Sequence, residues 1–255
     1  MLTPEGLQNA ATRLADARRV VVSTGAGMSR ESGIPTFRDA QEGLWARFDP
    51  QELATVAGFR AAPARVWSWY AYRRGRMLSC RPHAGHAALV ELEQRIPQLT
   101  LVTQNIDGLH QVAGSSAVVE LHGSIHRCRC LDCGRPAEEQ VPAAEDEVER
   151  EPARCHRCGG YLRPDVVWFG EMLPAEAVER AWNAVAECDV LLVVGTSGLV
   201  WPAAELPHLA KRGGATVIEV NPVASEVTPV ADIFLPGPAG EVLPAIVAGM
   251  AAGQG

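Results

Sequence analysis

The sequence predicts an α/β protein built on a doubly wound parallel sheet, and three observations support this prediction. The runs at 20–22 (VVV) and 190–194 (VLLVV) are continuously apolar, as in strands that are covered on both faces. Apolar residues recur at helical spacing between several such runs, so strands and helices alternate. A glycine turn, Gly25-Ala26-Gly27, follows the first run at the place where Rossmann-like folds bind dinucleotide phosphates.

The individual elements follow from the same patterns. Residues 1–19 have helical apolar spacing and carry Glu5 and Asp16, which favours an amphipathic helix over a secretory signal. After the first strand, candidate strands lie at 99–103, 117–121, 165–169, 190–194 and 216–220. Candidate helices lie at 83–95, 175–187 and 202–212. The Gly/Ala-rich tail from Ala248 is expected to fray.

Two stretches break this alternation and are interpreted as insertions. Residues 29–81 contain short helical patterns and three tryptophans, and residues 124–164 contain two Cys pairs and an acidic run for which we have no functional interpretation. We expect a single unit over 1–255 with a large Rossmann-like part over about 1–28, 82–123 and 165–255.

Composition bounds the class of protein. The chain of 255 residues is 47% hydrophobic and 21% charged, and it has no apolar run near the roughly eighteen residues that a membrane span requires. A net charge of −7 argues against a protein that binds a phosphate backbone. Seven cysteines, four of them in two C-x-x-C pairs, favour metal thiolates in a reducing compartment. We expect a cytoplasmic monomer without nucleic-acid or membrane partners.

The four paired cysteines predict one structural zinc ion. Cys130, Cys133, Cys155 and Cys158 have the spacing of a closed tetrahedral thiolate site. Cys128 makes the first motif C-x-C-x-x-C and could compete for the metal, but the pair Cys130 and Cys133 has the usual knuckle spacing. His126 and His156 are weaker candidates, because four thiolates already close the shell.

The glycine turn and a second loop predict a ligand site at the sheet edge. Arg30 occupies the place of the third glycine of G-x-G-x-x-G, so an ordinary strand-to-helix turn stays possible. In the second loop Gln104, Asn105 and Asp107 follow an apolar strand, where polar groups are costly unless they have partners. Turn and cap chemistry is the alternative for this loop.

Five segments taken together resemble the sirtuins, which are NAD-dependent protein deacylases. They are GAGMSRESGIPTFR (25–38), TQNIDGLH (103–110), LHG (121–123), the two Cys pairs and VGTS (194–197), in family order over nearly the whole chain. The resemblance implies NAD as co-substrate and His122 as the general base, which suits an imidazole that is largely neutral at pH 7. The resemblance implies in addition that the unit over 1–255 is catalytic and that the insertions 29–81 (helical) and 124–164 (zinc-binding) form a small domain beside the large part. It also implies NAD contacts by Gly25, Ala26, Gly27, Phe37, Arg38, Trp45, Gln104, Asn105, Ile106, Asp107, Gly195, Thr196, Ser197, Asn221 and Ala239.

The resemblance further implies acylated lysine in proteins or peptides as substrate, with nicotinamide and O-acyl-ADP-ribose as products. Tyr70 and Arg73 match a Tyr-x-x-Arg pair that binds the acyl carboxylate in the class III lineage, which implies desuccinylase and demalonylase as well as deacetylase activity. A solvated basic helix face is the alternative, and so is a preference for acetyl-lysine alone. The substrate peptide is expected to bind as a strand along Val167, Trp168, Phe169 and Gly170. Two rival functions are an ADP-ribosyltransferase and a non-catalytic NAD or zinc module.

Overall fold

The computed structural model describes residues 2–35, 49, 53–146 and 148–252. These residues form a six-stranded sheet of order β3-β2-β1-β7-β8-β9, in which every pairing is parallel. The strands are β1 (Arg19–Thr24), β2 (Gln98–Thr103), β3 (Val118–Glu120), β7 (Val190–Val194), β8 (Thr216–Asn221) and β9 (Ile233–Pro236). This order is that of dinucleotide-binding doubly wound folds, so the predicted fold class is confirmed.

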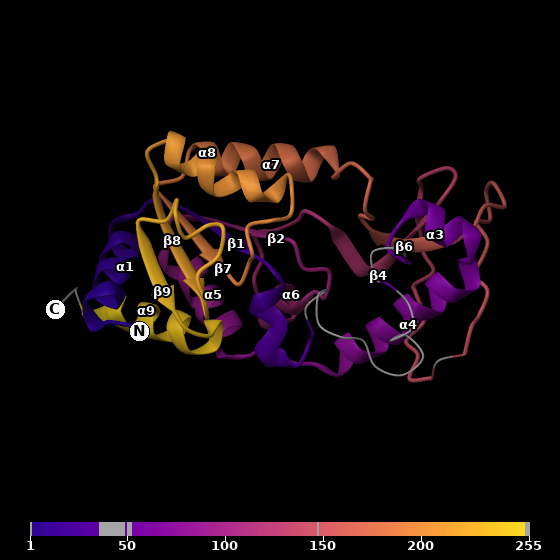
Figure 1. Ribbon diagram of the computed structural model, residues 1–255, viewed down its shortest axis with the longest axis horizontal. Coiled ribbons are helices and arrows are strands. Elements are labelled where there is room, and N and C mark those ends of the chain that lie inside the picture. The colour runs from indigo at the N-terminus through magenta and orange to yellow at the C-terminus, as the bar shows by residue number, and fades with distance from the viewer. Residues whose placement is uncertain (1, 36–48, 50–52, 147, 253–255) are drawn as a thin grey trace.

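Each face of this sheet has its own hydrophobic core, which explains the continuous apolar strands. Along β7, Leu192 packs with the helices of one face and Leu191 with those of the other. One face is covered by α1 (Pro4–Asp16), α5 (Ala84–Arg95) and α9 (Ala239–Ala252), and the other by α7 (Ala175–Ala186) and α8 (Leu206–Arg212). Figure 1 shows both layers.

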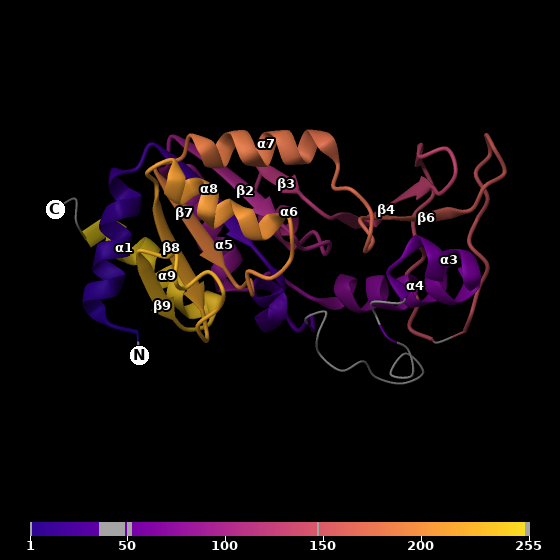
Figure 2. The same ribbon diagram turned by 45° about the horizontal axis from the view of Figure 1, so that its top comes forward.

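A three-stranded antiparallel sheet of order β5-β4-β6 lies beyond the carboxyl ends of the large sheet. Its strands are β4 (Gly123–Cys130), β5 (Pro136–Ala137) and β6 (Leu162–Val166), and it packs with α3 (Val56–Ala61) and α4 (Pro63–Ser79). Figure 2 shows these elements side by side. Tyr70 on α4 and Trp168 after β6 belong to the separate core that they share.

The expected parallel strand at 165–169 is wrong in range and in sheet. The strand covers Leu162–Val166 and pairs antiparallel with β4, with Gly123 opposite Val166. The apolar residues that suggested the later range include Trp168, which is buried in the small core outside any strand. A buried apolar side chain does not by itself distinguish a strand from a loop that packs into a core.

Other predicted elements hold with small changes of boundary. The amphipathic N-terminal helix is confirmed as α1, whose N-cap Thr3 accepts a hydrogen bond from the Gly6 N–H. The predicted helix at 202–212 begins as the short turn η3 (Ala203–Glu205) before α8. Strand β9 was not predicted. Fraying from Ala248 was also wrong, because α9 continues to Ala252 and Met250 packs into the core.

None of the helices in the described ranges has the length and apolarity that a bilayer crossing requires.

Candidate active site

The turn after β1 packs directly against the turn after β7. The Gly25 N–H donates to the Val194 carbonyl (3.0 Å) and the Gly27 N–H to the Gly195 carbonyl (2.8 Å). A Cβ added at Gly27 would lie 2.7 Å from the Gly195 oxygen, and one at Gly195, whose φ is +62°, would lie 2.4 Å from the Met28 nitrogen. The glycines are therefore required for the close approach of two backbones, besides any approach to a ligand.

A buried polar cluster lies behind this turn and contains two of the predicted site residues. The turn continues as the 3-10 helix η1 (Ala26–Ser32), which buries Ser29. The Ser29 hydroxyl donates to Asp107 Oδ2 (2.7 Å) and accepts from Asn105 Nδ2 (3.0 Å). Asn105 Nδ2 also donates to the Gly25 carbonyl (2.9 Å). Both amide hydrogens of Asn105 are thus used within the protein, which leaves Oδ1 as the group that can accept from a ligand or water.

Asp107 is held by two donors and is almost fully buried. Its Oδ1 accepts from the Leu109 N–H (2.9 Å), at the start of α6 (Leu109–Ala113), while Oδ2 accepts from Ser29. Burial raises the pKa of Asp107, although these two hydrogen bonds oppose the rise. Sequence reasoning did not name Ser29, because a serine in a glycine turn gives no sign of its distant carboxylate partner.

His122 follows β3 and is oriented by a backbone carbonyl. Its Nδ1 lies 3.0 Å from the Gln104 carbonyl oxygen, so Nδ1 carries the hydrogen and Nε2 is left as an acceptor. Burial lowers the pKa of His122, although the bond to Gln104 opposes this. The imidazole is therefore neutral at pH 7 and can take up a proton at Nε2. The His122 carbonyl in turn accepts from the Val167 N–H (2.9 Å).

The ends of β2, β7 and β8 meet around Thr196. Asn221 Nδ2 donates to the Thr196 carbonyl (2.8 Å), and Gln104 Nε2 to the Thr196 hydroxyl (3.4 Å). Ala239 begins α9, and the next N–H, of Gly240, donates to Glu31 on η1 (2.8 Å). The structure therefore brings most of the predicted cofactor residues to one edge of the sheet. Phe37, Arg38 and Trp45 lie outside the described residues.

Three histidines next to this edge were not singled out from the sequence. His83 Nε2 donates to the Met28 carbonyl (2.7 Å), and His110 Nε2 lies 3.0 Å from the Thr24 hydroxyl. The ring of His86 lies 5.0 Å from that of His110, centre to centre. Burial lowers the pKa of His86 to about 3 and that of His110 to about 4. Both rings are therefore neutral. His83 ties the start of α5 to η1, and His110 ties α6 to the end of β1.

The predicted acyl-binding residues lie in the small core. Tyr70 is buried, and the Arg73 guanidinium carbon lies 5.5 Å from the centre of the Tyr70 ring and 4.8 Å from that of Trp69. Burial raises the pKa of Tyr70 and lowers that of Arg73. The loop after β6 contains buried Trp168 and half-exposed Phe169, whose N–H donates to the Ala54 carbonyl (2.9 Å).

The four paired cysteines converge as predicted. The sulfur atoms of Cys130, Cys133, Cys155 and Cys158 all lie within 4.8 Å of one another. Four thiols in a tight cluster fit the donor set of tetrahedral zinc. Cys128 is not part of the cluster: its side chain is buried in the small core, and burial raises its pKa to about 12. His126 bonds the Asp107 carbonyl (2.8 Å) and His156 the Glu139 carboxylate (2.6 Å), so neither belongs to the cluster.

Comparison with known proteins identifies the family. The Sir2 family profile matches residues 25–202, and the chain belongs to this family. It is 53% identical over 239 residues to NAD-dependent protein deacylase 2 of Pyrobaculum aerophilum, covering 94% of each chain. It is 52% identical over 237 residues to NAD-dependent protein deacylase 1 of Pseudomonas aeruginosa, covering 92% of this chain and 95% of the relative.

Solved structures agree with this assignment. A Sir2 homologue in complex with NAD matches with a TM-score of 0.90 and 42% identity, covering 97% of this chain and 95% of the other. The structure of Sir2Af2 bound to a myristoylated histone peptide matches with a TM-score of 0.77 and 35% identity, covering 99% of each chain.

Proposed function

We propose that this chain removes acyl groups from protein lysine side chains in an NAD-dependent reaction that releases nicotinamide and O-acyl-ADP-ribose. The relatives named NAD-dependent protein deacylase and the homologue that holds NAD support this proposal. The observation that carries it is the orientation of His122, whose Nδ1 is tied to the Gln104 carbonyl while Nε2 keeps a lone pair. A neutral, oriented imidazole of this kind is suited to general-base catalysis.

NAD supplies the ribose carbon that the acyl oxygen attacks and the hydroxyls that later receive the acyl group. In the proposal His122 takes the proton of a ribose hydroxyl at Nε2. Asn105 orders a water through its unused Oδ1, and Asp107 holds the nicotinamide carboxamide. Burial of Asn105 and Asp107 supports these assignments, because a buried site limits hydrolysis of the coenzyme by bulk water.

The remaining NAD contacts are assigned to the turns at the same sheet edge. The packing of Gly25 and Gly27 on Gly195 supports a binding edge formed by β1 and β7 together. We also propose that the chain divides into a large part (1–28, 82–123 and 165–255) and a small domain formed by the insertions 29–81 and 124–164. The proposed contacts are Gly25, Ala26, Gly27, Phe37, Arg38, Trp45, Gln104, Ile106, Gly195, Thr196, Ser197, Asn221 and Ala239.

We further propose that the enzyme accepts acyl groups that end in a carboxylate, such as succinyl and malonyl, as well as acetyl. The guanidinium of Arg73 next to the hydroxyl-bearing ring of Tyr70 supports this preference, because a carboxylate accepts charge-assisted hydrogen bonds. The myristoylated peptide bound by Sir2Af2 supports acyl chains longer than acetyl in this family. The acyl preference is then measured as the ratio of kcat/KM for a succinyl- or malonyl-lysine peptide to kcat/KM for the acetyl-lysine peptide.

The substrate peptide is proposed to bind as a strand along Val167–Gly170, opposite residues 198–201. Exposed apolar side chains on both segments support this assignment: Phe169 is 48% exposed and Trp201 66%. Main-chain pairing supplies most of the affinity in such a mode, so broad peptide tolerance follows.

One experiment tests the reaction. The purified chain is incubated with NAD and a panel of acetyl-, malonyl- and succinyl-lysine peptides, and products are identified by mass spectrometry. We expect free lysine peptide, nicotinamide and O-acyl-ADP-ribose, and loss of turnover in His122→Gln. A modified protein without free lysine would indicate ADP-ribosyl transfer, and no consumption of NAD would indicate a binding module.

A second experiment tests the acyl preference. Arg73→Met should lower kcat/KM for succinyl-lysine at least about tenfold more than for acetyl-lysine, as for the loss of one charge-assisted contact. Arg76→Met, on an exposed position of the same helix, is the matched control and should leave the ratio unchanged. Equal losses on both peptides in Arg73→Met would contradict the proposed carboxylate contact.

A further inference from the structure

Trp168 is held by three contacts of different kinds: two hydrogen bonds and a cation-π contact. Its backbone N–H donates to Glu171 Oε2 (2.8 Å), and its indole Nε1–H donates to the Tyr70 hydroxyl oxygen (2.9 Å). The guanidinium carbon of Arg163 lies 3.3 Å from the centre of the indole ring. With only 2% of its surface exposed, the side chain has a single well-defined position.

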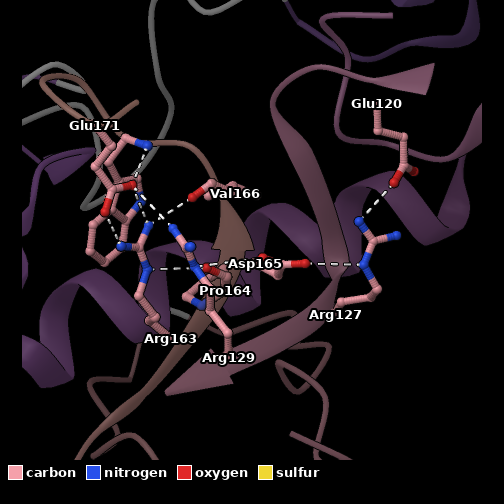
Figure 3. A network of polar contacts seen from close by, with 9 residues as sticks. Glu120, Arg127, Arg129, Arg163, Pro164, Asp165, Val166 and Glu171 are labelled. Carbon is pink, nitrogen blue, oxygen red and sulfur yellow. Dashed lines mark hydrogen bonds and ion pairs between the residues drawn. The ribbon is translucent and has the colours of Figure 1, made fainter. Parts of the chain in front are cut away.

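The Arg163–Glu171 pair closes the loop that carries Trp168. Arg163 is also 2% exposed, and its guanidinium binds both carboxylate oxygens of Glu171 and the Val166 carbonyl (2.7 Å). Arg129 adds a second cation 3.4 Å from the Glu171 carboxylate. Figure 3 shows these side chains converging on Glu171. Such a bidentate pair fixes direction as well as distance, so the loop from β6 to Glu171 is held at both ends.

The contact between Trp168 and Tyr70 fixes the direction of a hydrogen. An indole N–H can only donate, so the Tyr70 oxygen must accept, and the phenolic hydrogen points to another acceptor. No described residue accepts that hydrogen. Since Tyr70 is buried, an unused donor there is costly unless a ligand satisfies it.

A cation stands beside this donor. The Arg73 guanidinium lies over the Tyr70 ring at 5.5 Å, on the same face of α4. An O–H donor of fixed direction next to a guanidinium is complementary to a carboxylate.

We propose that Trp168 is a specificity-determining positioning residue: its indole N–H makes the Tyr70 hydroxyl a donor to the distal carboxylate of the acyl chain, and the Arg163–Glu171 pair keeps the indole in place. The inference rests on the proposed preference for carboxylate-bearing acyl groups, and it adds a residue that does not itself touch the carboxylate.

Trp168→Phe tests this step, because it keeps an aromatic ring under Arg163 and the backbone bond to Glu171 while it removes the indole N–H. The readout is the ratio of kcat/KM for succinyl-lysine to that for butyryl-lysine, which has the same chain length without the carboxylate. We expect this ratio to fall about tenfold, as for one lost hydrogen bond to a charged acceptor. Trp182→Phe, on α7 against a core of the large sheet, is the control and should leave the ratio unchanged.

A double-mutant cycle with Tyr70→Phe separates positioning from simple support of the loop. In the Tyr70→Phe background there is no hydroxyl to orient, so adding Trp168→Phe should leave the succinyl to butyryl ratio unchanged. The inference would be overturned if Trp168→Phe lowered kcat/KM equally for succinyl-lysine and butyryl-lysine. It would also be overturned if Trp168→Phe lowered the succinyl to butyryl ratio as much in the Tyr70→Phe background as in the parent chain.

Two further measurements keep the outcomes distinct. If Arg73→Met and Tyr70→Phe both leave the ratio unchanged, the proposed carboxylate preference fails. If both change it and Trp168→Phe does not, only the inference on Trp168 fails. Should Trp168→Phe not fold, Glu171→Gln replaces it: weakening the pair with Arg163 should lower the same ratio about threefold, and an unchanged ratio would contradict the inference.

Discussion

The two halves of the site are held together in different ways. At the edge of the six-stranded sheet, backbone groups and neutral side chains such as Ser29 and Asn105 make the contacts. In the loop after β6, the buried cation Arg163 and the carboxylate of Glu171 do so. At the edge, hydrogen bonds from backbone and uncharged side-chain donors hold Asp107 and Asn105 in place, whereas in the loop an ion pair gives a short segment a fixed shape. The predictions below test this difference, beginning with the largest expected effect.

Substitution of Gly195 should be the most damaging single change at the sheet edge. In Gly195→Ala the new Cβ meets the Met28 nitrogen at 2.4 Å and φ is positive, so the two turns must separate. We expect a loss of more than about 4 kcal/mol in unfolding free energy, or no folded protein. Gly134→Ala, also at positive φ but with no atom within 4 Å of the new Cβ, should cost only about 1 kcal/mol in urea denaturation.

Removal of one zinc-cluster thiol should affect the small sheet more than the large one. Cys155→Ser should lower bound zinc from one per chain to near zero and cost several kcal/mol, because metal binding is linked to folding. Metal analysis measures the bound zinc. Amide hydrogen exchange, compared between β4–β6 and the strands β1 and β7, shows which sheet is destabilised more. Cys128→Ser should keep its zinc; loss of metal in that variant would contradict the assignment of the four ligands.

Breaking the ion pair should destabilise the loop through an uncompensated charge. Arg163→Met leaves Glu171 with Arg129 as its one ion-pair partner among the described residues, and we expect a loss of about 3 kcal/mol in chemical denaturation. The double variant Arg163→Met/Glu171→Gln should recover part of this loss. Arg212→Met, which removes an exposed pair with Glu205, is the control and should cost less than about 1 kcal/mol. Equal losses of unfolding free energy in Arg163→Met and Arg212→Met would mean that the buried pair contributes no more to stability than the exposed pair.

Mild acid should destabilise the histidine-containing edge of the large sheet at a higher pH than it destabilises the loop that follows β6. His86 and His110 have folded-state pKa values of about 3 and about 4, below the value near 6.5 of the unfolded chain. The unfolded state therefore binds more protons as pH falls, and stability that is complete above pH 6.5 is lost at up to about 1.4 kcal/mol per pH unit for each histidine. Glu171 differs: burial alone would raise its pKa, but the bond from Arg163 holds it below the ordinary value, so it stays ionised.

Unfolding free energies at pH 7, 6 and 5 measure this slope. His86→Gln should show a smaller slope than the parent chain, and His208→Gln, at an exposed position of α8, is the control and should change the slope less than His86→Gln does. An unchanged slope in His86→Gln would contradict the assignment.

Much of the fold and part of the site could be predicted from the amino-acid sequence. The runs at 20–22 and 190–194 identified the central strands, because a strand buried on both faces must be apolar throughout. The spacing of the cysteines predicted the cluster, since a C-x-x-C knuckle is local. The polar residues after β2 were found because polar groups at a buried strand end are costly without partners, and the family resemblance assigned them to NAD.

Contacts between distant parts of the chain could be decided only by the tertiary structure. Strand β6 belongs to the antiparallel sheet because Val166 pairs with Gly123, and Cys128 is excluded from the cluster because its sulfur does not lie with the other four, although Cys130 is part of the same small core. The contact between Tyr70 and Trp168 joins residues 98 positions apart. The sequence alone therefore determined the central strands, several helices and the local metal motif, where neighbouring residues set the pattern. Packing decided which partners complete the site, because a hydrogen bond between remote residues leaves no periodic signal along the chain.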